Sequence, residues 1–171
     1  FFFPVTDSEG APGKAYGMGV AAADYDSDGD PVLYLTAWGP DQLYRHEGGR
    51  YIEVAAEAGL GHAGWTTSAV FFDADLDGDL DVFLVNGSRL PEPYGSGPGS
   101  PPPGDALFEN LGGLRFRDVT EKAGLIESAW GCGATVGDYD NDGDPDIFVA
   151  NWGRDTLWKN RGDGSFEDAT E

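Results

Sequence analysis

Short apolar or alternating segments, separated by glycine-rich or acidic turns, recur along the chain in the same order three times. Small residues dominate the first segment of each copy, at 16–23, 64–72 and 130–137. The second segment is apolar, at 32–35, 82–85 and 147–149. The third lies at 42–46, 106–110 and 156–160, and the fourth at 51–54, 116–120 and 166–170. β-Branched and aromatic runs of this length, bounded by turn residues, predict four short antiparallel strands in each copy.

A four-stranded unit repeated every ~40–60 residues is typical of the blades of a β-propeller. The sequence therefore predicts an all-β chain that forms a single repeat domain over residues 1–171. We assign the blades to residues 15–56, 64–120 and 129–171. Small residues in the first strand of each blade indicate close packing near the axis of a radial assembly.

Two segments fall outside these blades. Residues 1–7 match the fourth-strand segment and predict the outer strand of a preceding or neighbouring blade. Residues 89–104 are rich in Pro, Gly and Ser and predict an inserted surface loop in the second blade. Propellers usually close with about 4–8 blades, so three blades and one strand predict an open arc. It could belong to a longer propeller, pair into a six-bladed ring, or join head to tail in a filament.

Aspartates at alternate positions form a loop between the first and second strands of each blade. The fourteen carboxylates are Asp24, Asp26, Asp28, Asp30, Asp73, Asp75, Asp77, Asp79, Asp81, Asp138, Asp140, Asp142, Asp144 and Asp146. Two unit charges about 4 Å apart repel by roughly 4 kcal/mol at an effective dielectric constant near 20. A hard divalent cation removes this repulsion, and an all-oxygen ligand set favours Ca²⁺.

The start of each loop, D-x-D-x-D-G, is shared with the EF-hand, but the EF-hand requires a bidentate Glu at position 12. That position holds Leu35, Leu84 or Val149, and strands rather than helices follow. We expect the side chains at positions 1, 3, 5 and 9 and the backbone carbonyl of position 7 to bind the ion. Val32 replaces the acid at position 9 of the first loop, which predicts a weak or empty site there. The alternative interpretation is a set of solvated acidic turns.

The composition limits the class of partner. With 31 acidic and 10 basic residues, the formal net charge is −21, which argues against binding to nucleic acid or to anionic membrane surfaces. No apolar run approaches the ~20 residues of a membrane-spanning helix. A hydrophobic content of 40% argues against disorder. These properties suit a secreted or cell-surface protein in a calcium-rich exterior.

Other reactive residues give weaker signals. His46 and His62 have no partner at a repeated position, and the lone Cys132 predicts a packed hydrophobe rather than a disulfide. Asn86-Gly87-Ser88 is a formal glycosylation sequon, although a turn is the favoured interpretation. Tryptophans recur at repeat positions, and packing is favoured over a carbohydrate platform; they are Trp38, Trp65, Trp130, Trp152 and Trp158. No motif for catalysis is recognisable, so we predict that the chain is not an enzyme.

The acid loops and the small-residue strands before them resemble the FG-GAP/VCBS repeats of integrin-α-like β-propellers. The segments 116–125 and 157–166 are similar to bacterial ASPIC/UnbV and cartilage-acidic-protein-type repeats. The resemblance covers nearly the whole chain. It implies calcium at the acid loops, a location outside the cell, and binding or scaffolding rather than catalysis.

The leading hypothesis is therefore a non-catalytic, calcium-stabilised extracellular β-propeller segment. It would act in self-assembly, through strand or blade-face association into a filament or closed oligomer, or in adhesion to another extracellular protein or glycan. The alternatives are a ligand- or glycan-binding module of a larger secreted protein and, third, an accessory domain of an enzyme.

Overall fold

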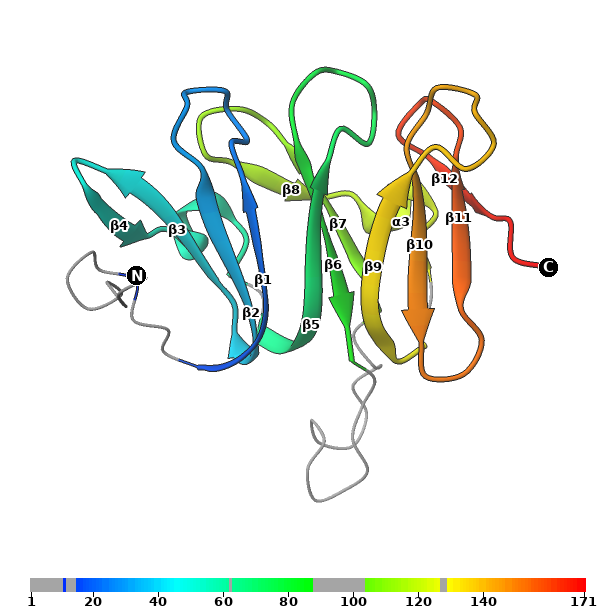
Figure 1. Cartoon of the computed structure of the whole chain (residues 1–171), viewed down its shortest axis with the longest axis horizontal. Helices are drawn as coiled ribbons and strands as arrows, with labels where there is room; N and C mark the ends of the chain where they lie inside the picture. Colours follow the sequence, from blue (N-terminus) through cyan, green and yellow to red (C-terminus); the bar gives the residue numbers. More distant parts are fainter. Residues whose placement is uncertain (1–10, 12–14, 62, 88–103, 127–128) are drawn as a thin grey trace, which may run out of the picture.

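The fold is a shallow arc of three four-stranded antiparallel blades (Figure 1). The computed structural model describes residues 11, 15–61, 63–87, 104–126 and 129–171. Blade 1 comprises β1 (Tyr16–Ala23), β2 (Val32–Pro40), β3 (Gln42–Glu47) and β4 (Arg50–Glu53). Blade 2 comprises β5 (Ala63–Phe72), β6 (Asp81–Asn86), β7 (Ala106–Asn110) and β8 (Phe116–Asp118). Blade 3 comprises β9 (Gly131–Gly137), β10 (Asp146–Asn151), β11 (Thr156–Asn160) and β12 (Phe166–Asp168). The predicted all-β, propeller-type fold is confirmed.

Blades 1 and 2 are joined more closely than the repeat pattern predicted. β2 extends to Pro40, well beyond the expected end at Leu35, and its last residues pair with the start of β5, Trp38 opposite Trp65. The two blades therefore form one eight-stranded sheet, whereas blade 3 is a separate sheet in the order β12-β11-β10-β9.

A short helix follows the fourth strand of blades 1 and 2, which the sequence analysis missed. Helix α2 (Ala55–Ala58) and helix α3 (Thr120–Ala123) each end at a glycine in the left-handed conformation. The fourth strand of blade 2 thus ends at Asp118, and the prediction that it continues to Thr120 was wrong. A Cβ at Gly59, the C-cap of α2, would lie 2.9 Å from the carbonyl oxygen of Phe116. Glycine therefore lets the helix end pack against the next blade.

The hydrophobic core consists of two clusters, one at each junction between blades. The cluster between blades 1 and 2 includes Tyr34, Leu43, Val82 and Phe108. The cluster between blades 2 and 3 includes Phe83, Leu107, Ile147, Trp158 and Phe166. The sheet faces that meet at these two junctions are therefore buried against each other, and this burial of apolar surface is the main stabilising term.

A buried asparagine also joins each pair of blades. The side-chain amide of Asn110 on β7 donates to the backbone oxygen of Tyr25 in blade 1 (3.4 Å). Asn160 on β11 donates in the same way to Ala74 of blade 2 (2.9 Å) and to Pro145 of its own loop (3.1 Å). We call these two contacts the asparagine latches. The equivalent residue of blade 1 is His46.

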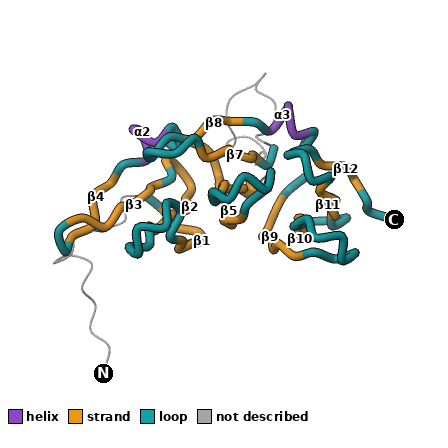
Figure 2. The backbone as a smooth tube through the Cα atoms, turned by 90° about the horizontal axis from the view of Figure 1, so that it is seen from above, coloured by secondary structure: helices purple, strands orange, loops and turns teal. Residues whose placement is uncertain are grey.

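The small-residue strands β1, β5 and β9 lie together along one side of the arc, opposite helices α2 and α3 (Figure 2). Close packing is clearest at Gly131, where a Cβ would lie 2.2 Å from a methyl of Val85. The prediction that Cys132 is packed was wrong, because its side chain is exposed. Its counterpart in blade 2, Thr67, is half-buried, and its hydroxyl donates to the backbone oxygen of Gly131 in the next blade (3.0 Å). Cys132 holds that place on the last blade of the arc.

Five aromatic rings form a continuous row across the three blades. In order, they are Tyr16, Trp38, Trp65, Trp130 and Trp152, with centroid separations of 6.0, 6.2, 5.2 and 6.5 Å. The two end rings are the most exposed, whereas Trp158 lies in the core. Four of the five tryptophans thus line one row, and packing explains them only in part.

Several predictions lie outside the described residues: the outer strand at 1–7, most of the insertion at 89–104, and His62. Asn86 is described, and it is fully buried, with its side-chain amide donating to the backbone oxygen of Gly104 (2.7 Å). A glycan on this nitrogen would require the end of β6 to open. The sequon is therefore structural.

We predict that Asn160→Ala lowers the free energy of unfolding by about 2–3 kcal/mol, since it leaves buried carbonyls without a donor. Asn160→Asp should be nearly as destabilising, because the carboxylate cannot donate. Denaturant unfolding measures both variants, with the exposed Glu121→Ala as control. If Asn160→Ala were as stable as the wild type, the asparagine latch would not stabilise the fold.

Candidate metal-binding loops

The three acid loops lie at the same edge of the arc, each between the first and second strands of its blade (Figure 1). They share one backbone conformation. The fourth residue of each loop has a positive φ, 57° at Ser27, 62° at Leu76 and 61° at Asn141, and the glycine at position 6 has a φ of 92–100°. A non-glycine residue in the left-handed region is uncommon. Its presence in all three copies shows that the loop geometry dominates local preference.

The first aspartate of each loop holds the turn closed. In the second loop, the Asp73 carboxylate accepts the backbone N–H groups of Asp77 (3.1 Å) and Gly78 (3.0 Å). Asp24 and Asp138 make the same two contacts at the same distances in their loops. Each of these oxygens keeps a lone pair for another ligand.

The turn gathers three carboxylates in each loop, with one oxygen of each within 4.8 Å of the others. The groups are Asp24, Asp26 and Asp28; Asp73, Asp75 and Asp81; and Asp138, Asp140 and Asp146. Positions 1, 3 and 9 therefore converge in the second and third loops. In the first loop Val32 stands at position 9, and position 5 completes the group.

The remaining predicted ligands lie in the loops but outside these groups. At position 5, Asp77 and Asp142 each accept the N–H of the residue two places on. At position 7, the side chains of Asp30, Asp79 and Asp144 do not join the three-carboxylate groups of the described chain. This position can contribute its backbone carbonyl, as in the original prediction.

The aspartate at position 9 is buried and accepts two backbone N–H groups. Asp81 accepts the N–H of Ala74 (2.9 Å) and that of Asn110 (2.8 Å). Burial raises the pKa of Asp81 to about 6, against the lowering effect of these two hydrogen bonds. Asp146 makes the matching contacts with Tyr139 (3.0 Å) and Asn160 (2.8 Å). The negative charge of Asp81 is thus unfavourable in the fold until a cation joins it.

The residue directly before Asn110 and Asn160 in the third strand differs in charge between the blades. The sequence alone did not indicate that it lies near the acid loop. In blade 3 it is Lys159, whose ammonium contacts Asp140 and also lies 3.0 Å from Asp142. This ion pair lowers the pKa of Asp142 and raises that of Lys159. In blade 2 the residue is Glu109, which pairs with Arg117 (2.5 Å), and in blade 1 it is Arg45. The third loop therefore carries an internal counter-charge.

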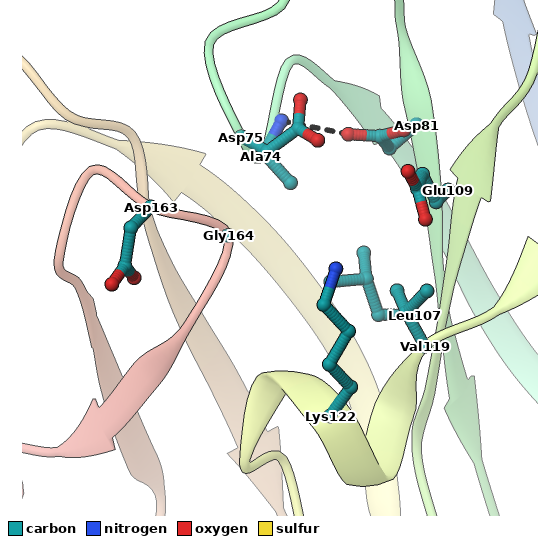
Figure 3. A pocket seen from close by; sticks show the side chains of 9 residues that line it. All are labelled: Ala74, Asp75, Asp81, Leu107, Glu109, Val119, Lys122, Asp163 and Gly164. Carbon is teal, nitrogen blue, oxygen red and sulfur yellow. Dashed lines mark hydrogen bonds between the residues drawn. The ribbon is translucent and has the colours of Figure 1, made fainter.

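Figure 3 shows a small pocket next to the second loop, at the junction of blades 2 and 3. Asp75, Asp81 and Glu109 meet at one side, and Lys122 of α3 points toward them from below. Burial, and next the charge of Asp77, raise the pKa of Asp75. Within the described chain no ion pair neutralises the carboxylates of this loop. The second loop therefore differs from the third, in which Lys159 pairs with Asp140 and Asp142.

The donor set fits a hard divalent cation. Each loop offers carboxylate and backbone oxygens and no nitrogen or sulfur, which suits Ca²⁺ or Mg²⁺ more than a transition metal. A flexible cluster of mixed carboxylate and carbonyl oxygens accommodates the larger ion more easily.

Fold and loops together define a propeller-type repeat protein with an acid loop in every blade. The family model described as FG-GAP-like repeat matches residues 24–84, 94–149 and 138–171. The chain therefore belongs to the FG-GAP-like repeat family, and the predicted resemblance to FG-GAP repeats is confirmed.

Two curated relatives are both cartilage acidic protein 1. The human protein is 28% identical over 175 residues, which cover 89% of this chain and 25% of the relative. The mouse protein is 26% identical over 174 residues, covering 88% and 25%. The chain thus spans about a quarter of the length of these relatives. Among the described residues, no helix has the length and apolar character to cross a membrane.

We predict that Lys159→Ala raises the calcium affinity of the third loop roughly three- to tenfold, because a competing charge is removed. Isothermal titration calorimetry of a variant with the other loops disabled, Asp26→Asn with Asp75→Asn, measures this affinity. Arg161→Ala serves as control, since Arg161 pairs with Glu167 away from the loop. An unchanged calcium affinity in Lys159→Ala would contradict the prediction, because the Lys159 ion pair would then not compete with calcium.

Calcium binding to the second loop should weaken as the pH falls. With a pKa of about 6, Asp81 is about nine-tenths protonated at pH 5, which predicts an affinity about tenfold lower than at pH 7. Because this pKa is raised above its unfolded value, the ionised Asp81 destabilises the calcium-free fold above pH 6, and that penalty disappears as the pH falls. Calorimetry of Asp26→Asn with Asp140→Asn at both pH values tests this, and a pH-independent affinity would contradict it.

Proposed function

We propose that this chain is a non-catalytic, extracellular calcium-binding module whose fold is stabilised by the metal. The observation that carries the proposal is the threefold recurrence of one loop geometry that brings three aspartate oxygens within 4.8 Å of one another. Membership of the FG-GAP-like repeat family supports it. The metal would relieve the repulsion among carboxylates that have no sufficient internal counter-charge.

An extracellular location is supported by two considerations. The relatives are named for cartilage and for acidity, and the net charge of −21 matches the second part of that name. Loops of this kind in extracellular modules often bind calcium at about 10⁻⁴–10⁻³ M, which is effective outside cells and not in the cytosol.

A role in binding or assembly, rather than in catalysis, is supported by the chemistry of the chain. His46 lies with its Nδ1 3.5 Å from Asp30 and its ring against Tyr51, in a position shared with structural asparagines of the other blades. Fourteen aspartates belong to the acid loops, and the buried Asp41 and Asp105 outside them accept structural hydrogen bonds, from Ala37 and Thr66 and from Asn86 respectively. What the chain offers to a partner is the set of blade faces and the aromatic row.

A glycan- or ligand-binding module within a larger secreted protein is the second candidate. The aromatic row supports it, since Trp38 and Trp152 are exposed and sugar rings stack on such side chains. Binding of oligosaccharides that is lost in Trp152→Ala, with no change in self-association, would favour this candidate.

We predict that saturating calcium raises the melting temperature by about 5–10 °C for each occupied site. Matched variants at position 3 separate the loops: Asp75→Asn and Asp140→Asn should each lose one such increment, whereas Asp26→Asn should lose less, since Val32 leaves the first loop incomplete. Differential scanning calorimetry in calcium and in chelator measures these shifts. Equal losses at all three loops would contradict the ranking, and no shift for the wild type would contradict the function.

A further inference from the structure

Asn160 of blade 3 contacts both its own acid loop and the loop of blade 2. Its backbone N–H donates to the Asp146 carboxylate (2.8 Å), and its side-chain amide donates to the backbone oxygen of Pro145 (3.1 Å). The same amide donates to the backbone oxygen of Ala74 in the second loop (2.9 Å). Asn160 is fully buried, and its side-chain oxygen accepts the N–H of Gly162 (3.0 Å). One firmly held side chain therefore joins the two loops.

Ala74, the acceptor in the second loop, lies between two of the carboxylates that converge there. Asp73 and Asp75 flank it in the sequence, and its own N–H donates to Asp81 (2.9 Å), the third member of that group. Ala74 itself is buried. A side chain of blade 3 thus fixes the backbone from which the second loop presents its converging oxygens.

The turn after Asn160 makes a second, independent connection between the same loops. A Cβ at Gly162 would lie 2.6 Å from a carboxylate oxygen of Asp144 in the third loop. A Cβ at Gly164 would lie 3.0 Å from the Cβ of Asp75 in the second loop. Figure 3 shows Gly164 near Asp75 on the wall of the pocket between blades 2 and 3. We call residues 160–164 the loop bridge.

The junction of blades 1 and 2 is connected less completely. Asn110 donates to the backbone oxygen of Tyr25 in the first loop (3.4 Å), but Val32 replaces the aspartate that would accept the N–H of Tyr25. The turn after Asn110 also stays clear of the second loop, because a Cβ at Gly112 would meet no described atom within 4 Å. The first loop is therefore not tied to the second as the second is tied to the third.

We propose that the loop bridge couples calcium binding at the second and third loops, so that these two sites bind with positive cooperativity, whereas the first loop binds independently. Asn160 and Gly164 are positioning residues, since neither belongs to the converging carboxylates. The inference rests on the calcium-binding function proposed above.

The sign of the coupling follows from conformational entropy. When the third loop is occupied, Asp146 is held in place, and so is Asn160, which donates to it. The amide of Asn160 then restrains the backbone at Ala74, so the second loop loses less freedom when its own carboxylates close on an ion. Linkage requires the same factor in the opposite direction, and we expect it to be about five- to tenfold in affinity.

Isothermal titration calorimetry with calcium, using the whole chain, tests the coupling. Asp26→Asn leaves the second and third loops, and adding Asp140→Asn or Asp75→Asn leaves only one of them. The product of the two stepwise association constants in Asp26→Asn should exceed the product of the two single-loop constants about five- to tenfold. Equal products would overturn the proposal.

Removing the bridging side chain should remove the coupling. Asn160→Ala, introduced into the same three backgrounds, should make the two products equal. Because this variant also lowers stability, Val149→Ala is the matched control: it removes buried core contacts of blade 3 and leaves the loop bridge intact. Persistent coupling in Asn160→Ala, or its loss in Val149→Ala, would contradict the assigned route.

A second substitution tests the route while keeping the asparagine latch. Gly164→Ala crowds Asp75, so it should weaken the second loop severalfold in Asp26→Asn with Asp140→Asn, although it lies in blade 3. It should leave the third loop unchanged in Asp26→Asn with Asp75→Asn. Gly112→Ala is the control, since its φ is similar (71° against 74°) and it meets no described atom within 4 Å. Unchanged affinity of the second loop in Gly164→Ala would contradict the proposed contact.

The first loop provides an internal control. Adding Asp26→Asn to Asp140→Asn should leave the affinity of the second loop unchanged, and a five- to tenfold change would contradict the proposal. The inference and the function can be told apart by the same titrations. Absence of calcium binding in the wild type would refute the function and the inference with it, whereas binding at independent sites would refute only the coupling.

Discussion

The buried aspartate at position 9 of the acid loop connects the loop, its own blade and the neighbouring blade through one chain of hydrogen bonds. In blade 3, Asp146 accepts the N–H of Tyr139 within the loop and that of Asn160 at the end of β11. Asn160 then donates to Ala74 in the loop of blade 2. A charge is thereby fixed inside the fold, and a buried charge is tolerated only when it is paired or coordinated. The carboxylate cluster and the blade junction therefore depend on each other.

Blade 1 shows what happens when that aspartate is absent. Val32 replaces it, and His46 replaces the latch asparagine, so both members of the pair are lost together. The position is instead apolar and buried, with Val32 in the core between blades 1 and 2. The loop of blade 1 keeps its conformation through Asp24 and Asp28, whose carboxylates accept backbone N–H groups of the loop. Loop geometry is thus separable from the buried charge, and the loop of blade 1 is the one at which the proposed metal binding is weakest.

The sequence predicted the repeated strands and acid loops well, because alternation in strands and D-x-D spacing are local signals. It did not predict α2 and α3, since four residues are too few to show helical periodicity. Lys159 and Glu109 were overlooked because neither belongs to the loop motif. Their proximity to the carboxylates depends on how β11 and β7 pack in the folded blade. Contacts made across blades, such as Asn160 with Ala74, join residues 86 positions apart and leave no local pattern.

The error over Cys132 and the exposure of Trp152 have one physical cause. The repeat position of a residue predicts burial only when an adjacent blade covers its face, and in this arc the neighbour supplies that cover. Phe83 and Phe148 occupy the same position and differ by 41% in exposure, although their own strands are equivalent. This difference in exposure arises from the neighbouring blade and not from the residue itself. In a repeat protein of this kind, the exposure of a side chain therefore depends on the adjacent blade as much as on its own strand.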